Sequence, residues 1–249
     1  MSIWVLLRGL TRESRHWGGF VSTFREHLPD ARVLPLDLPG NGRLNALRSA
    51  YSVDEMAAFC RAELRRQGVA PPYHVLAMSL GAMVAVAWAQ RHPQEVAGCV
   101  LINTSLRPFS PFHQRLRPAS AATLLKLLLF ARSDRPWEQA ILRLTTRHAG
   151  AAVLDDWLAL RRERPVSRSN ALRQLWAAAR FSAPWAGPAP PMLVLASAKD
   201  ALVDPRCSSQ LATRWGLAFA EHPSAGHDLP LDDGAWVAQQ VRDWLAAMR

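Results

Sequence analysis

The chain has 249 residues, of which 49 % are hydrophobic and 20 % are charged, and its formal net charge is +10. This length predicts one core with an insertion and excludes two full-sized domains. The start, MSIWVLLRG, lacks the parts of a signal peptide, and the apolar stretch LLKLLLFA is too short to span a bilayer. The three cysteines have no metal-like spacing, and their odd number disfavours a disulfide framework. We expect a cytoplasmic protein with no membrane span.

Short apolar runs rich in β-forming residues alternate with helix-length segments along most of the chain. This alternation is typical of an α/β fold, with a parallel sheet and crossover helices. The expected strands are residues 3–7, 32–36, 74–78, 99–103, 192–196 and 218–221, and the expected helices are residues 18–27, 53–67, 80–91, 206–215 and 233–247.

Residues 107–185 interrupt this alternation. They begin with the proline-punctuated RPFSPFHQRLRP and continue as several amphipathic helices, and FSAPWAGPAPP (residues 181–191) returns the chain to the next strand as a stiff linker. The segment holds 14 basic and five acidic residues, whereas the rest of the chain holds 16 and 15. Nearly all of the excess positive charge therefore belongs to this insertion.

The stretch YHVLAMSLGAMVAVAWAQRHP (residues 73–93) changes from a strand pattern to a helix pattern at Ser79. A serine at such a corner adopts a strained turn that requires small residues two positions before and after it, here Ala77 and Gly81. The turn would point the hydroxyl out of the sheet, beside the backbone amide of Leu80. This pattern predicts a nucleophile elbow, and the alternative is that Ser79 only caps a helix. Its place after the third expected strand favours the elbow.

A serine hydroxyl becomes a good nucleophile only beside a base, so the elbow requires a histidine oriented by a carboxylate. In parallel α/β folds with a nucleophile elbow, the acid and then the histidine follow the serine along the chain, each after a later strand. Asp200 follows the strand PMLVLAS, and His227 follows the next one, so both lie where this order requires.

Two other residues compete for these roles. Asp204 could serve in place of Asp200, but the pattern DALVDP fits Asp204 to the start of the following helix. His222 could replace His227, but it lies where strand meets loop, whereas Gly226 leaves the backbone free to aim His227 inward. We therefore favour Ser79, Asp200 and His227 as the catalytic residues.

These stretches resemble the motifs of the α/β-hydrolase superfamily. AMSLG matches the elbow, SAKDALVDP the acid loop, SAGHDLP the histidine loop, and LDLPGNG the turn usually written DxPGxG. The resemblance implies an α/β-hydrolase core of residues 1–106 and 186–249, with a mostly parallel sheet, and a helical cap of residues 107–185. Most members have eight strands, and this chain starts at what would be the third, so we expect the N-terminal hairpin to be missing.

The resemblance implies acyl transfer through a covalent acyl-enzyme. Ser79 would attack a carbonyl carbon with His227 as base, and Asp200 would hold the imidazole. The backbone amides of Leu10 and Leu80 would bind the oxyanion. We expect neither a metal ion nor an organic cofactor.

Two positions depart from the family pattern. Family members usually carry His-Gly after the first strand seen here, where this chain has Arg8 and Gly9. The simplest interpretation is that the charge of Arg8 pairs with a neighbouring loop. Ala82 stands where a second glycine is common, which a helix should tolerate.

In this fold the cap lies over the active site and shapes the choice of substrate. Most of its apolar side chains should pack the cap onto the core, and about a third of them should line a pocket for a hydrophobic acyl or alkyl group. The candidates are Phe109, Phe112, Leu124, Leu125, Leu128, Phe130, Trp137, Leu154, Trp157 and Trp176.

The cap's positive charge has two interpretations. It is either a solvated arginine face or a docking surface for an acidic partner, in which Arg143, Arg147, Arg161 and Arg162 are the candidate contacts. An acyl carrier protein would be such a partner. The capped architecture and cap charge are similar to the pimeloyl-acyl-carrier-protein methyl ester esterases of biotin synthesis. Nucleic acid is not expected, because no aromatic–basic platform or reading helix is present.

The leading function is therefore a serine carboxylic-ester hydrolase for small or carrier-linked esters. A second hypothesis keeps the three catalytic residues but applies them to a lactone, a thioester or a C–C bond. A third, of another class, is a non-catalytic ligand-binding protein on the same fold, which Arg8 favours and the complete catalytic set disfavours.

Overall fold

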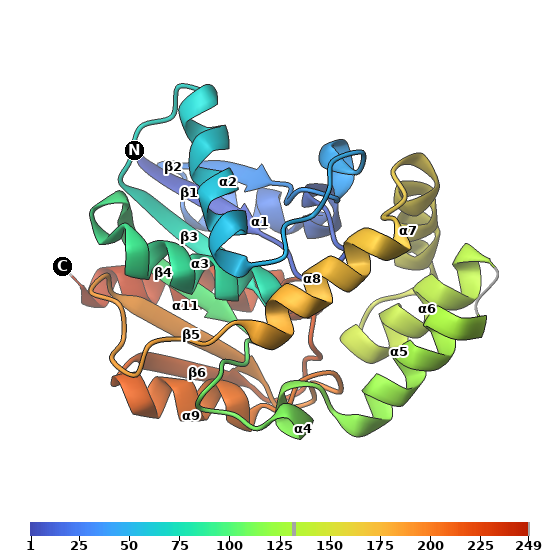
Figure 1. Cartoon of the computed structure of the whole chain (residues 1–249). Coiled ribbons are helices and arrows are strands. Elements are labelled where there is room, and N and C mark those ends of the chain that lie inside the picture. The colour runs from blue at the N-terminus through green and yellow to red at the C-terminus, as the bar shows by residue number, and fades with distance from the viewer. Residues whose placement is uncertain (131–132, 249) are drawn as a thin grey trace.

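The structure is a computed structural model that describes residues 1–130 and 133–248 (Figure 1). Six strands form one sheet in the order β2-β1-β3-β4-β5-β6, and all neighbouring strands run parallel. Each expected strand is present, with ends shifted by up to three residues, so the predicted α/β fold with a parallel sheet is confirmed. The strands are β1 (Ser2–Leu7), β2 (Ala31–Leu36), β3 (Tyr73–Met78), β4 (Val96–Ile102), β5 (Met192–Ser197) and β6 (Ala218–His222).

Helices cover both faces of the sheet because successive strand side chains point to opposite sides. In β1, Trp4 and Leu6 pack with helices α1 and α11, whereas Val5 and Leu7 pack with α2, α3 and α9. The buried strands are therefore apolar along their whole length rather than alternating. These helices are α1 (Phe20–His27), α2 (Val53–Arg66), α3 (Leu80–Arg91), α9 (Arg206–Trp215) and α11 (Gly234–Ala247).

Between β4 and β5, the described residues form five helices, which extend beyond the carboxyl ends of the strands (Figure 1). The chain enters this segment at Arg107 and leaves it at Ser182, and these two residues form a parallel β-bridge. The backbone N–H of Ala183 also donates to the carbonyl of Arg107 at 2.7 Å. Entry and exit therefore lie side by side. The helices are α4 (Phe112–Arg115), α5 (Pro118–Phe130), α6 (Asp134–Thr145), α7 (Ala151–Glu163) and α8 (Arg168–Arg180).

The three cysteines, Cys60, Cys99 and Cys207, are buried and form no disulfide. Burial among apolar side chains raises the pKa of the Cys60 and Cys99 thiols to about 12. Within residues 1–130 and 133–248, each helix is too short or too polar to cross a membrane.

Candidate active site

Ser79 occupies the corner between β3 and α3 in a conformation that serine rarely adopts. Its φ and ψ angles are 54° and −116°, with a positive φ that is sterically costly for a residue with a Cβ. Its backbone N–H donates to the carbonyl of Ile102 on β4 at 3.0 Å, which fixes the corner to the neighbouring strand. This is the strained strand-to-helix turn that the sequence predicts.

The need for a small residue at position 81 comes from the neighbouring strand β1. A Cβ on Gly81 would lie 2.5 Å from the carbonyl oxygen of Leu7 and 2.7 Å from that of Arg8. The close neighbour is thus the end of β1, not Ala77 on the other side of the turn. On the other side of the corner, a Cβ on Gly9 would lie 3.2 Å from the Cβ of Ser79, so the loop after β1 also approaches the serine closely.

Asp200 and His227 meet above the carboxyl ends of β5 and β6. The Nδ1 atom of His227 lies 2.6 Å from Oδ2 of Asp200, and both side chains are buried. The other carboxylate oxygen of Asp200 accepts the backbone N–H groups of Leu202 and Val203 at 2.8 and 2.9 Å, which orients the carboxylate. With Nδ1–H donating to Asp200, Nε2 of His227 is left as the basic nitrogen.

The two competing residues have other contacts. Asp204 pairs with Arg206 at 2.7 Å, which holds the pKa of its carboxyl below the usual value, and it accepts the Arg206 backbone N–H beside the start of α9. Nδ1 of His222 accepts the backbone N–H of Ala225 at 2.9 Å. Both therefore stabilise the loops that carry Asp200 and His227.

Ser79 lies between two cavities. One, of about 100 Å³, is lined by Ser79, His227, Leu10 and residues of α6. The other, of about 140 Å³, is mainly apolar and is lined by Ser79, Leu10, Leu80 and residues of α4, α5 and α8. Among the described residues, no hydrogen bond joins Ser79 Oγ to His227, a contact that in serine hydrolases commonly tightens only in the substrate complex.

The two candidate oxyanion donors border the same space. Leu10 lines both cavities and Leu80 lines the larger of the two. In the part of the chain that the structure describes, neither backbone N–H is a donor among the hydrogen bonds of turns, loops and caps. The following residue, Thr11, donates its backbone N–H to the side chain of Gln174 on α8 at 2.8 Å, which holds the loop in place.

Arg8 does pair with a neighbouring loop, and that loop is the one carrying His227. Its guanidinium donates to both carboxylate oxygens of Asp228, at 3.0 and 2.5 Å, and both side chains are 2 % exposed. The guanidinium also lies 4.8 Å from the ring centre of Trp17. This bidentate ion pair joins the loop after β1 to the histidine loop across the candidate site.

Two further residues hold the histidine loop and were not anticipated from the sequence. The side-chain amide of Asn103, at the end of β4, donates to the carbonyl of His227 at 2.8 Å and to Ser197 Oγ at 2.9 Å. The carboxylate of Asp232 accepts the backbone N–H of Gly226 at 2.7 Å. A polar residue directly after an apolar strand was the available signal for Asn103.

Of the ten apolar residues named for the predicted cap, those that the structure describes are packed inside the protein, line a cavity beside Ser79, or are exposed, and Phe112 both lines a cavity and is exposed. Leu154 and Trp157 are buried, and Phe109 packs against the core. Three of the ten line the cavities beside Ser79, and four are exposed, Phe112 and three others. The side chain of Leu128 lies outside the described residues. The cavity-lining residues are Phe112, Leu124 and Trp137, and the exposed ones are Phe112, Leu125, Phe130 and Trp176.

The four candidate docking arginines differ in their partners. Arg161 pairs with Asp134 at 2.7 Å and with Glu138 at 3.1 Å, and Arg147 donates to the carbonyl of Lys199. Arg143 and Arg162 are exposed and have no carboxylate partner among the described residues. Arg161 and Arg147 are therefore already engaged within the protein.

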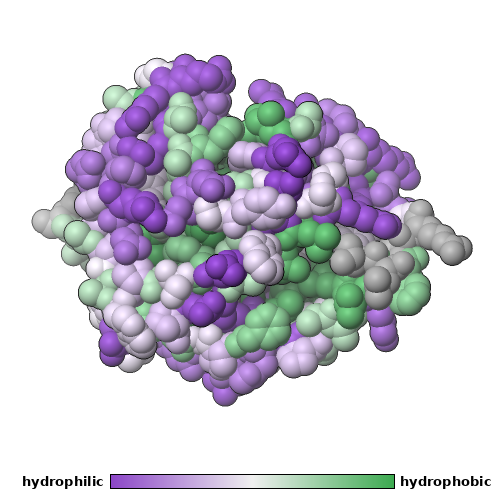
Figure 2. Space-filling model, in the orientation of Figure 1, coloured by the Kyte–Doolittle hydropathy of each residue, from purple (hydrophilic) through white to green (hydrophobic). Residues whose placement is uncertain are grey.

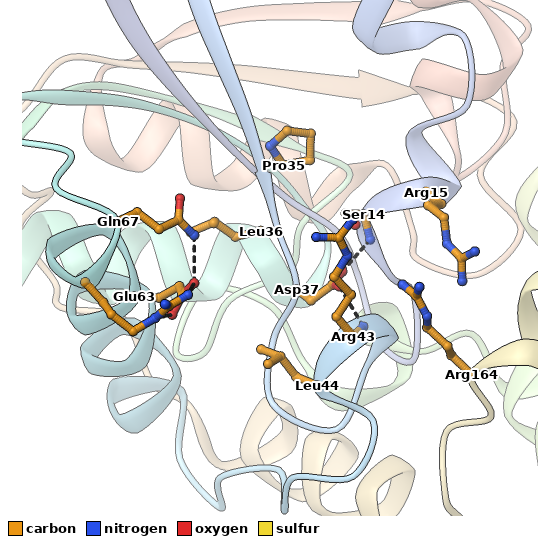
Figure 3. A pocket seen from close by; sticks show the side chains of 11 residues that line it. Ser14, Arg15, Pro35, Leu36, Asp37, Arg43, Leu44, Glu63, Gln67 and Arg164 are labelled. Atoms are coloured by element: carbon orange, nitrogen blue, oxygen red, sulfur yellow. Dashed lines mark hydrogen bonds and ion pairs between the residues drawn. The ribbon is translucent and has the colours of Figure 1, made fainter.

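A larger hollow, of about 750 Å³, lies away from Ser79, beside β2 and the end of α2 (Figure 3). Its polar groups bind one another. The carboxylate of Asp37 accepts the backbone N–H groups of Ser14 and Arg43 at 2.6 and 3.0 Å, and Gln67 donates to Glu63 at 2.7 Å. The described residues that line this hollow include no histidine, and its Asp37 carboxylate is occupied by backbone N–H groups, so we place the candidate active site at the smaller cavities.

Metal ligands are not gathered anywhere in residues 1–130 and 133–248: no three His, Cys, Asp or Glu side chains lie close enough together to hold an ion.

Comparisons with known proteins identify the family and the fold. A family model described as the Alpha/beta hydrolase family matches residues 4–240. The biotin biosynthesis bifunctional protein BioHC of Cellvibrio japonicus (strain Ueda107) is 35 % identical over 103 residues, 41 % of this chain and 19 % of that protein. The chain thus matches only about a fifth of the length of this relative.

Two solved structures illustrate the likeness in fold. BpoC from Mycobacterium tuberculosis H37Rv superimposes with a TM-score of 0.79 at 21 % identity, covering 100 % of this chain and 93 % of BpoC. A thermophilic esterase from Thermogutta terrifontis gives a TM-score of 0.75 at 20 % identity, covering 99 % of this chain and 90 % of the esterase.

Proposed function

Because the chain belongs to the alpha/beta hydrolase family, we propose that it is a serine hydrolase of the carboxylesterase type. One observation carries the proposal. Ser79, held at a strained corner, lines the same cavity as His227. Nδ1 of His227 is hydrogen-bonded to the buried Asp200. A nucleophile, a base and an orienting acid in this arrangement are the requirements for acyl transfer.

The reaction proceeds in two steps. Ser79 Oγ attacks the ester carbonyl while Nε2 of His227 takes its proton, and the backbone amides of Leu10 and Leu80 bind the oxyanion. His227 then protonates the leaving alcohol. Water, activated by the same histidine, hydrolyses the acyl-enzyme and restores Ser79. The apolar lining of the larger cavity suits a hydrophobic acyl or alkyl group.

The test is labelling with a fluorophosphonate probe, followed by a panel of p-nitrophenyl esters of rising chain length. Wild-type protein should be labelled, and Ser79→Ala and His227→Ala should lower kcat by about 10⁴-fold or more. Ser22→Ala, a change on the exposed side of α1, is the matched control and should keep full activity. A folded wild-type protein that neither reacts with the probe nor turns over any ester would overturn the proposal.

A narrower proposal concerns the substrate: a methyl ester whose acyl chain is carried by an acyl carrier protein, in the cytoplasm. Two observations support it. The relative that part of this chain matches, BioHC, is named as a biotin biosynthesis protein. Residues 107–185 are also strongly basic, as a surface that binds an acidic carrier would be. Arg143 and Arg162 are the exposed candidate contacts.

This narrower proposal is tested by comparing kcat/KM for a carrier-linked methyl ester with that for the free ester. The carrier should raise kcat/KM, and Arg143→Glu with Arg162→Glu should remove the gain without changing turnover of the free ester. Arg32→Glu, at the start of β2 and far from the carboxyl ends of the strands, is the control. Equal rates on both substrates would exclude a carrier.

A further inference from the structure

Helix α8 buries two uncharged polar side chains and leaves its three large apolar side chains about half exposed. Asn170 and Gln174 are 5 % and 0 % exposed, whereas Leu172, Leu175 and Trp176 are 50 %, 46 % and 53 % exposed. Helices normally bury their apolar stripe, because burial of apolar surface is the main source of stability. The inverted arrangement of α8 therefore needs a separate explanation.

The buried polar side chains show that this orientation is specific. Asn170 donates to the carbonyl of Leu47 and accepts the backbone N–H of Ser49, both at 2.9 Å. Gln174 accepts the backbone N–H of Thr11 at 2.8 Å and donates to Asn41 and Ser49. Because these groups are satisfied only in this orientation, α8 cannot rotate to bury its leucines without leaving them unpaired.

Two other helices of residues 107–185 also expose large apolar side chains, and one of them, α4, is hydrogen-bonded to α8 through Arg115 and the Ala178 carbonyl at 2.7 Å. Phe112 on α4 is 69 % exposed and Leu125 on α5 is 56 % exposed. Phe112 and Leu175 both line the apolar cavity that reaches Ser79. The face that carries α8 in Figure 1 shows hydrophobic surface among hydrophilic side chains in Figure 2. The cavity that reaches Ser79 is therefore lined by side chains of two helices, α4 and α8, that also expose large apolar side chains.

Charged residues are distributed unevenly along the insertion of residues 107–185. Residues 107–133 contain five basic residues and no acidic one, and residues 164–185 contain four basic residues and no acidic one. The intervening residues 134–163, which include α6 and α7, contain five of each. The whole positive excess of the insertion therefore accompanies the helices that expose apolar side chains.

We propose that this surface docks onto an anionic lipid surface, with the cavity mouth facing the lipid. We call it the apolar–basic face, defined as Phe112, Leu125, Leu172, Leu175 and Trp176 with the exposed Arg168 and Arg180. Exposed leucine and aromatic side chains insert at the boundary between headgroups and acyl chains, and neighbouring arginines bind lipid phosphates. The inference goes beyond the proposed function because it concerns where the protein finds its substrate.

The chemistry favours lipid over other occupants. A second copy would bring two positively charged faces together, which is electrostatically unfavourable. An acidic protein would satisfy the arginines but would need a matching apolar groove for side chains from three separate helices. A bilayer supplies both the negative charge and a deformable apolar layer, and the cytoplasmic leaflet of membranes is anionic.

The test is co-sedimentation of the whole protein with vesicles of phosphatidylcholine alone or mixed with phosphatidylglycerol. The protein should bind the mixed vesicles at least tenfold more tightly, and added salt should weaken this binding. Leu172→Ser with Trp176→Ala should reduce binding about tenfold or more. Arg168→Glu with Arg180→Glu should reduce it roughly fivefold for each charge removed.

Matched controls isolate the face from the rest of the molecule. Phe219→Ser, on β6, and Arg32→Glu change exposed residues elsewhere and should leave binding unchanged. Ser79→Ala should bind vesicles like the wild type, so a failure of the proposed hydrolysis would not affect this result. Equal binding to both vesicle types would overturn the inference. So would a dimer, or a complex with acyl carrier protein, that the face variants abolish while vesicle binding is absent.

Discussion

At the scale of single residues, the expected pairing of Arg8 with a neighbouring loop is made with Asp228, a partner that the sequence alone does not identify. Asp228 follows His227 directly, and Arg8 lies two residues before Leu10, so the pair joins the loop of the candidate base to the loop of a candidate oxyanion donor. Both charges are buried, and a buried charge that loses its partner typically costs about 3–5 kcal/mol. The pair should therefore affect stability and geometry together.

Two variants separate these effects. Arg8→Met should lower the free energy of unfolding by about 3–5 kcal/mol, because Asp228 stays buried without a partner. The double variant Arg8→Met, Asp228→Asn should regain most of this stability but keep a reduced kcat with little change in KM, because the bidentate link is lost. Urea unfolding and ester turnover measure both. A double variant with wild-type kcat would show that the pair serves stability alone.

At the scale of secondary-structure elements, helix α10 (Leu229–Asp232) joins the histidine loop to the turn between α6 and α7. The carboxylate of Asp232 accepts Thr146 Oγ1 at 2.5 Å and the backbone N–H groups of Arg147 and His148, as well as that of Gly226. One carboxylate thus binds the inserted helices and the loop of His227. Movement of that turn should be transmitted to the histidine.

Replacing Asp232 with alanine should loosen both segments at once. We expect the free energy of unfolding to fall by roughly 1–3 kcal/mol, because several backbone donors lose their acceptor. The amides of residues 147, 148 and 226 should exchange hydrogen faster, and kcat should fall. Asp243→Asn, on the exposed side of α11, is the control and should leave exchange at these positions unchanged. Faster exchange at 147 and 148 alone would contradict the coupling.

Helix α8 also shows where a sequence-based prediction of elements fails. The sequence predicts amphipathic helices in residues 107–185, whose apolar side chains, Trp176 among them, should pack the cap onto the core or line a pocket. The partners of Asn170 and Gln174 lie more than 100 residues earlier, on loops that the pattern of α8 does not describe. Orientation is therefore decided by tertiary hydrogen bonds and not by hydrophobicity.

At the scale of the whole molecule, acid stability should depend on Glu95, which joins three elements. Its carboxylate accepts two hydrogen bonds from Arg61 at 2.6 Å, one from Arg65 and one from the indole of Trp88. The hydrogen bonds from Arg61 are the main reason that its pKa falls to about 2. Because the folded pKa lies below the ordinary value, this contribution is complete above about pH 4.5 and is lost as the pH falls toward 2.

Glu95→Gln should accordingly destabilise the protein by roughly 2–3 kcal/mol at pH 7 and by progressively less between pH 4.5 and 2. Chemical unfolding across this pH range measures the difference between the two proteins. Asp155→Asn, which breaks the exposed pair with Arg135, should change stability little at any pH. A difference that stays constant down to pH 2 would show that Glu95 acts through packing.

Most of the sheet and the order of the candidate catalytic residues could be predicted, because both follow from patterns within short windows. Strand and helix periods locate the elements, and the strand-to-helix corner at Ser79 is visible in five residues. The partners of most long-range contacts outside the candidate catalytic residues could not be predicted. Arg8 and Asp228 are 220 positions apart, and the requirement for Gly81 comes from the end of β1. Such pairings depend on the assembled fold.

The buried thiols of the three cysteines can report local opening of the core without an added label. Alkylating reagents attack the thiolate, and in the native protein each sulfur is both shielded from solvent and, at Cys60 and Cys99, held in its unreactive protonated form. Modification of Cys60 on α2, Cys99 on β4 and Cys207 on α9, followed by mass spectrometry, would therefore time the opening of three parts of the core in one unlabelled sample.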